Sequence, residues 1–220
     1  MKGSFLGLAA SLTTFLLFAL ITTKPSLGQS DHVFDTKGNP LRWGRNYYIL
    51  PIIRGSIGGG LTLGSHNKSG CPLYVTQEHS DLEKGLSVAF SHKTSKLPFV
   101  STRDPLSITT TGPVATCKLS LTWKVIQEST TLWLVSTNGR SHLPNSKFRI
   151  VFYQSYYLIA FCPPLPEVPM PVVCPELGIY YAKDGTRYLA FGNGIEPLKF
   201  VFEKADLTNS QNLHYIETVV

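Results

Sequence analysis

Hydrophobic and polar side chains alternate along much of this chain, and short turns interrupt the alternation. In residues 119–125, Leu-Ser-Leu-Thr-Trp-Lys-Val, the apolar side chains occupy every second position. Leu198, Phe200 and Phe202 repeat this spacing between more polar neighbours. A period of two places alternate side chains on opposite faces of a β-strand. Long helical periodicity is absent after residue 28, so the pattern predicts an all-β protein.

Twelve strands are expected from this alternation, separated by turn-forming pairs such as Asn138-Gly139 and Asp184-Gly185. Short strands joined by such turns predict a barrel or a sandwich. Similar apolar segments begin at residues 48, 106 and 157, at intervals of 58 and 51 residues. Four strands in each interval would make a β-trefoil, a six-stranded barrel capped by hairpins. The expected strands are 47–52, 61–64, 73–77, 86–91, 106–110, 121–126, 132–136, 148–153, 156–161, 179–182, 187–191 and 198–203.

The start of the chain has the pattern of a secretory signal peptide. A basic Met1-Lys2 start is followed by an apolar run from Phe5 to Ile21 and by the small residues Ser26 and Gly28. The run has 17 residues, the short end of the ~17–25 that a membrane helix needs, so secretion is favoured over a membrane anchor. The sequence therefore predicts a signal peptide over 1–28, one β-trefoil domain over 29–207 and a C-terminal tail over 208–220.

Charge and motif content exclude several function classes. Without residues 1–28 the chain has 18 basic and 14 acidic residues, a net charge of +4 with no basic runs, so no nucleic-acid partner is expected. No G-x-S-x-G motif occurs, and the six histidines show no triad or metal-ligand spacing. We therefore expect no enzyme, no metal and no cofactor, and no membrane contact once the signal is removed.

Four cysteines, Cys71, Cys117, Cys162 and Cys174, follow the predicted signal. An even number in a secreted chain predicts two disulfides with three possible pairings. Spacing alone favours Cys71–Cys117 and Cys162–Cys174, and the absence of C-x-x-C argues against zinc. Asn67 begins the one N-glycosylation sequon, Asn-Lys-Ser, in a polar segment just before Cys71.

The main candidate for a functional site is the loop of residues 91–104. Its sequence is Ser-His-Lys-Thr-Ser-Lys-Leu-Pro-Phe-Val-Ser-Thr-Arg-Asp. Pro98 biases Leu97 toward extended backbone, because the proline ring clashes with an α conformation there. The loop should therefore hold Lys96 and Leu97 out from the surface. Trypsin-like enzymes cleave after a basic residue that pairs with a carboxylate in their specificity pocket. We therefore interpret the loop as a substrate-like segment that binds such an enzyme. The plainer alternative is an ordinary exposed lysine on a polar loop.

Seven motifs resemble, in order, those of the plant Kunitz-type trypsin inhibitor family. They are Asp35-Thr-Lys-Gly-Asn-Pro-Leu41, Tyr47-Tyr-Ile-Leu-Pro51, Cys71-Pro-Leu-Tyr-Val75, Asp104-Pro-Leu-Ser107, Tyr157-Leu-Ile-Ala-Phe-Cys162, Asp184-Gly-Thr-Arg187 and Pro197-Leu-Lys-Phe-Val-Phe202. The resemblance extends from Val33 to Lys204. It implies a β-trefoil, the same two disulfides, secretion or vacuolar storage in a plant, and inhibition of serine proteases.

The resemblance also implies roles for single residues. Aligning the family's loop through Phe99 and Pro105 puts its basic specificity residue at Lys96. The reactive loop is then Thr94, Ser95, Lys96, Leu97, Pro98 and Phe99. One extra residue on the N-terminal side makes Lys93 a second candidate and Arg103 a remote one. Where the family commonly has an asparagine that props the loop, this chain has Trp43, whose indole cannot donate the same pair of amide hydrogen bonds.

Together these observations predict a secreted, monomeric protein of plant defence that inhibits a trypsin-like serine protease through Lys96. The alternatives are a non-inhibitory relative, such as a storage or miraculin-like protein, and an inhibitor of another protease class that uses a different surface. The proline-rich segment 162–174 is a candidate for such a surface, because prolines keep extended shapes at low entropic cost.

Overall fold

The computed structural model describes residues 31–53, 58–66, 70–92, 97–112, 117–163 and 174–205. These ranges contain twelve strands and one 3-10 helix, η1 (Pro144–Ser146). The strands are β1 (Asn46–Pro51), β2 (Leu61–Ser65), β3 (Leu73–Gln77), β4 (Val88–Ser91), β5 (Ser107–Thr110), β6 (Lys124–Ser129), β7 (Leu132–Ser136), β8 (Phe148–Tyr153), β9 (Tyr156–Phe161), β10 (Gly178–Tyr181), β11 (Arg187–Gly192) and β12 (Phe200–Lys204). The predicted number and order of strands are confirmed.

Six strands form a barrel. They are hydrogen-bonded in the order β5-β4-β1-β12-β9-β8, and their pairings are antiparallel. An isolated bridge between Leu106 and Phe148 joins the two ends of this sheet, with two backbone hydrogen bonds of 2.8 Å. The sheet is therefore closed on itself, which removes its free edges.

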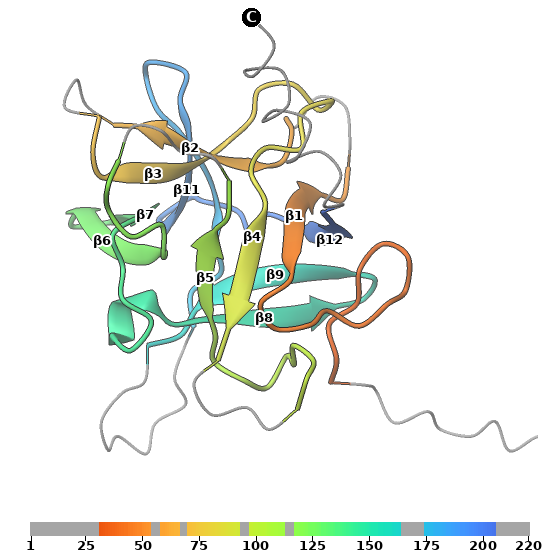
Figure 1. The fold of residues 1–220 in the computed structure, drawn as a ribbon. Coiled ribbons are helices and arrows are strands. Elements are labelled where there is room, and N and C mark those ends of the chain that lie inside the picture. The colour runs from red at the N-terminus through yellow and green to blue at the C-terminus, as the bar shows by residue number, and fades with distance from the viewer. Residues whose placement is uncertain are drawn as a thin grey trace, which may run out of the picture. The chain divides into compact units, whose positions relative to one another are not determined.

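The other six strands form three hairpins, β2–β3, β6–β7 and β10–β11, which pair with one another through β3, β7 and β11. In Figure 1, β2 and β3 lie at the top of the barrel, and the arrow of β4 points toward the opposite end. A six-stranded barrel with three capping hairpins is a β-trefoil, so the predicted fold is confirmed.

Apolar side chains of the barrel strands form the core. In β12, Phe200 and Phe202 are fully buried, whereas Val201 and Glu203 between and beside them are not. Burying such a side chain contributes about 1.5–3 kcal/mol. The indole of Trp123, also buried, donates to Thr110 Oγ1 at 2.9 Å, so its one polar group is satisfied.

One predicted strand has different bounds for a physical reason. Alternation over 121–126 predicts a single strand, but Thr122 bridges to Thr109 and Trp123 N donates to the carbonyl of Ile108. From Lys124 onward the chain pairs with β7 instead. One continuous alternating pattern therefore covers residues that pair with two different segments. The alternation does not reveal the change, because barrel strands and hairpin strands have the same period of two.

Two disulfides brace the barrel. Cys71 pairs with Cys117 and Cys162 with Cys174, at Cα–Cα distances of 6.0 and 4.9 Å, the pairing that spacing favoured. The first closes a segment that contains the whole 91–104 loop. The predicted signal peptide, the C-terminal tail, Asn67 and most of the proline-rich segment lie outside the described residues. Within the described ranges no helix is long and apolar enough to span a membrane.

Candidate functional site: the loop between β4 and β5

The loop that joins β4 to β5 starts and ends on buried, paired strands. Phe90 faces Ile108 across the pair, and Ser91 faces Ser107; Phe90 and Ile108 are fully buried. In Figure 1 the arrow of β4 points away from β2 and β3, so the loop begins at the end of the barrel opposite these cap strands. Of the predicted reactive-loop residues, Leu97, Pro98 and Phe99 are described, whereas Lys93, Thr94, Ser95 and Lys96 lie outside the described residues.

The part of the loop after Lys96, residues 97–103, is a segment that we call the C-terminal limb. It lies between two other segments of chain, since Phe99 bridges to Arg42 on one side and Ser101 bridges to His32 on the other. Two backbone hydrogen bonds join these three segments, from Val33 N to Val100 O (3.0 Å) and from Val100 N to Leu41 O (2.8 Å). The limb is thus paired along both edges.

Trp43 supports the limb at its first residue. Its indole Nε1 donates to the carbonyl oxygen of Leu97 at 3.0 Å, and its backbone N–H donates to Pro98 O at 3.4 Å. The indole also lies against the ring of His92, with centroids 5.9 Å apart. One side chain therefore contacts residues that precede and follow the undescribed tip, although it supplies a single side-chain hydrogen bond.

Local sequence explains how Trp43 reaches the loop. Gly44 follows it with φ of 69°, a left-handed conformation that glycine adopts without steric cost. Gly44 N then donates to the carbonyl of Phe90 at 3.0 Å. The chain therefore turns sharply between Trp43 and β1, and the turn is tied to the end of β4.

The aromatic ring of Phe99 gives the limb a second anchor. The His32 ring meets it edge-on at a centroid distance of 5.3 Å, and the Arg42 guanidinium lies 5.4 Å from its centroid. Beyond Phe99 the limb descends into the core, where Val100 is fully buried, while Leu97 is 56% exposed. The limb is thus buried in its middle, at Val100 and Ser101, and accessible at Leu97.

Two tyrosines of the barrel hold the segments on either side of the limb, and sequence reasoning gave them no role. The Tyr47 hydroxyl accepts from Arg42 N at 2.9 Å, and the Tyr157 hydroxyl accepts from Phe34 N at 2.9 Å. Burial raises the pKa of Tyr157, which keeps its hydroxyl protonated. Their sequence signal is a tyrosine in a strand rich in apolar residues, where a buried hydroxyl needs a partner.

Arg103, the remote specificity candidate, is engaged by a neighbour. Its Nε lies 2.8 Å from Asp31 Oδ1, although its side chain is 77% exposed. The hydroxyl of Ser101 accepts from Arg103 N at 3.1 Å. The structure therefore ties Arg103 to the body of the molecule at the base of the limb.

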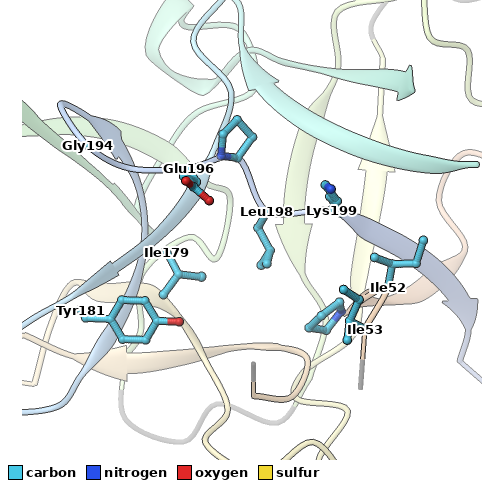
Figure 2. Close-up of a pocket in the computed structure, with 10 residues that line it drawn as sticks. Ile52, Ile53, Ile179, Tyr181, Gly194, Glu196, Leu198 and Lys199 are labelled. Carbon is cyan, nitrogen blue, oxygen red and sulfur yellow. The ribbon is translucent and has the colours of Figure 1, made fainter. Parts of the chain in front are cut away.

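A separate pocket lies beyond the other end of β1. Its volume is about 410 Å³, and Figure 2 shows the side chains of Ile53, Ile179 and Leu198 around it, with Tyr181 and Glu196 at its edge. Pro51 lines the pocket, whereas Trp43 precedes Asn46, the first residue of the same strand. The pocket is therefore distinct from the loop. Among the described side chains, no three of His, Cys, Asp or Glu are grouped to bind a metal ion.

These features define a β-trefoil that displays one braced loop, which is the architecture of a binding protein. The chain belongs to the legume Kunitz family of trypsin and protease inhibitors, whose model matches residues 33–204. This confirms the resemblance drawn from the motifs. The family is one of inhibitors, so the prediction that the chain is not an enzyme is also confirmed.

Relatives and solved structures agree with this assignment. The chain is 34% identical over 216 residues to Kunitz trypsin inhibitor 5 of Arabidopsis thaliana, covering 90% of this chain and all of that protein. It is 30% identical to miraculin of Synsepalum dulcificum, covering 88% and 95%. Soybean trypsin inhibitor, solved in complex with porcine pancreatic trypsin, superposes with a TM-score of 0.66 at 27% identity, covering 80% of this chain and all of that one.

Proposed function

We propose that this protein inhibits a trypsin-like serine protease by presenting the Lys96–Leu97 bond, with Lys96 entering the specificity pocket. Relatives named as trypsin inhibitors support the general activity. The observation that carries the site assignment is the support of Leu97 and the limb behind it, from the Trp43 hydrogen bond to the paired edges. A residue just before this limb would be presented on a fixed base.

A fixed limb explains how a substrate-like loop can inhibit. The protease serine attacks the Lys96 carbonyl, the bond to Leu97 N breaks, and the leaving amine takes a proton from the catalytic histidine. An ester now joins Lys96 to the enzyme. Because the limb is held by Trp43 and by its neighbours, the Leu97 amine stays near that ester, where it can re-form the peptide bond before water hydrolyses the ester.

Preorganisation also favours binding. A loop that already has its bound shape loses little conformational entropy on docking, and this raises affinity. The Cys71–Cys117 disulfide keeps both halves of a cleaved loop in one molecule, since the bond between residues 96 and 97 lies inside the segment that it closes. The same molecule can therefore be cut and resealed.

The remaining expectations belong to this proposal. The protein is secreted or vacuolar after loss of residues 1–28, acts as a monomer, and carries a glycan on Asn67. Thr94 and Ser95 contact the protease beside Lys96, and Lys93 is the alternative specificity residue.

Titration of the purified mature protein against trypsin and chymotrypsin tests the proposal. We expect tight, stoichiometric inhibition of trypsin and cleavage after Lys96 in the complex. Lys96→Ala should abolish inhibition of trypsin, because the specificity pocket then has no cation to pair with. Lys93→Ala is the matched control and should keep most of the activity.

Full inhibition by the Lys96→Ala protein would exclude this site. Rapid complete hydrolysis of the wild-type loop, or no interaction with either protease, would favour the non-inhibitory alternative. If Lys96→Ala still inhibits a protease of another class, the surface responsible lies elsewhere.

A further inference from the structure

The first described residues of the chain lie on the C-terminal limb. The backbone oxygen of Asp31 accepts from Thr102 N at 2.8 Å and from Thr102 Oγ1 at 3.3 Å. The carboxylate of the same residue pairs with Arg103 Nε at 2.8 Å. Three polar contacts from one residue thus hold two consecutive residues of the limb.

The next two residues continue this contact toward the cleavable bond. His32 bridges to Ser101, and its ring packs edge-on against Phe99. Val33 N donates to Val100 O at 3.0 Å. Residues 31–33, which we call the N-terminal strap, therefore contact the limb from Phe99 to Arg103.

The strap itself is anchored unevenly. Val33 is fully buried, its carbonyl accepts from Leu41 N at 2.8 Å, and the following Phe34 N donates to the Tyr157 hydroxyl. By contrast, the hydrogen bonds and ion pair described for Asp31 all go to Thr102 and Arg103. The barrel therefore fixes the strap from Val33 onward, whereas Asp31 is fixed by its contacts with Thr102 and Arg103 of the limb.

We propose that the N-terminal strap sets how long the inhibited complex survives, because it retains the limb after the loop is cut. This inference rests on the proposed function and extends it. Trp43 holds the Leu97 end of the limb, and the strap holds the opposite end at residues 99–103. Losing Asp31 and His32 from the strap lets the Leu97 amine move away from the ester at Lys96, so hydrolysis competes better with resealing of the bond.

The strap also gives the inhibitor a route of inactivation. The predicted signal cleavage leaves only Gln29 and Ser30 before Asp31. An aminopeptidase that removes four residues from that terminus would take away Asp31 and His32 but leave Val33, which the barrel holds. N-terminal trimming would thereby turn a lasting inhibitor into a slowly consumed substrate without unfolding it.

The test compares a protein that begins at Gln29 with one that begins at Val33. Each is mixed with stoichiometric trypsin, and the association rate and the appearance of loop cleaved after Lys96 are followed. We expect association rates within twofold, since Lys96 is still presented, and cleaved loop accumulating at least about tenfold faster in the shorter protein.

Single substitutions separate the ion pair from the backbone contacts. Asp31→Asn and Arg103→Gln should each speed loop cleavage about two- to fivefold, a small factor because both side chains are partly exposed and the pair is screened. The double variant should behave like either single one, as expected for two partners of one interaction. Glu203→Gln is the control, because it removes an ion pair of 2.6 Å between Glu203 of β12 and Lys84, which lies in the segment before β4. It should leave the cleavage rate unchanged.

Hydrogen exchange of the free proteins gives a readout that does not depend on inhibition. The Thr102 amide, which donates to Asp31, should exchange faster in the protein that begins at Val33, while amides of β12 should not change. Equal cleavage rates in the two proteins would overturn the proposal, whatever the exchange of Thr102, and equal Thr102 exchange would show that the strap does not hold the limb. If the protein that begins at Gln29 fails to inhibit trypsin, the proposed function fails instead, and Thr102 exchange alone decides whether the strap holds the limb.

Discussion

Removing one hydrogen-bond donor from Trp43 isolates its contribution to the loop. Trp43→Phe keeps an aromatic ring beside His92 but deletes the indole N–H, which lies 3.0 Å from Leu97 O. A neutral hydrogen bond contributes about 0.5–1.5 kcal/mol. Because Leu97 is 56% exposed, water can replace the lost donor, and no penalty for an unsatisfied buried carbonyl is added.

We therefore expect a loss of about 1 kcal/mol, which is about a fivefold weaker inhibition constant for trypsin. The loss is felt on docking, since a looser loop must be ordered by the protease. Inhibition constants and the rate of loop cleavage are measured side by side, with the melting temperature as a check on folding.

Trp43→Asn is the opposite arm of this experiment. An amide supplies two N–H donors where the indole supplies one, so we expect inhibition at least as tight as that of the wild-type protein and slower loop cleavage. Wild-type behaviour of Trp43→Phe would refute the role of the indole N–H. If Trp43→Asn and Trp43→Phe proved equally weak, the amide would not replace the indole, and its second donor would give no advantage at this position.

Two further changes test the frame around the loop. Tyr157→Phe removes the acceptor for Phe34 N and should lower the free energy of unfolding in urea by about 1–2 kcal/mol. Burial raises the pKa of Tyr157 in the folded protein above its ordinary value of 10.0. The free energy of unfolding of the wild-type protein should therefore fall as the pH rises above 10.0 and through the folded-state pKa, and that of Tyr157→Phe should fall less. Equal losses in the two proteins would contradict this. Replacing Cys162 and Cys174 by serine should cost up to about 3 kcal/mol of stability and leave trypsin inhibition intact, because the loop is enclosed by the other disulfide; lost inhibition in a still folded protein would show a role for this segment.

The fold was predictable because every strand carries its own signal. Alternation and tight turns are local properties, and strands such as β12 bury one face, as Phe200 and Phe202 show. Strand ends were less predictable. Residues 121–123 and β6 share one uninterrupted pattern but pair with different partners, and a change of partner leaves no mark on a period of two.

The site was predictable only in part, because its support is built from distant residues. Position 43 was identified through the family, but nothing local indicates that its indole reaches a carbonyl 54 residues away. The Asp31 contact to Thr102 spans 71 residues and depends on a single polar residue near the predicted new terminus. Contacts of this kind follow from the closed barrel, which brings the first segment beside the β4–β5 loop.

Support from two ends has a consequence for how this loop can vary. Trp43 supplies one side-chain hydrogen bond at Leu97, fewer than an amide could, whereas the strap adds an ion pair and backbone contacts at the far end of the limb. The two supports act on the same limb through different residues. Both supports oppose the same motion of the Leu97 amine. A protein that carries Trp43→Phe and also lacks residues 29–32 should therefore show a loop-cleavage rate raised by more than the product of the two single increases, because either support alone still limits that motion.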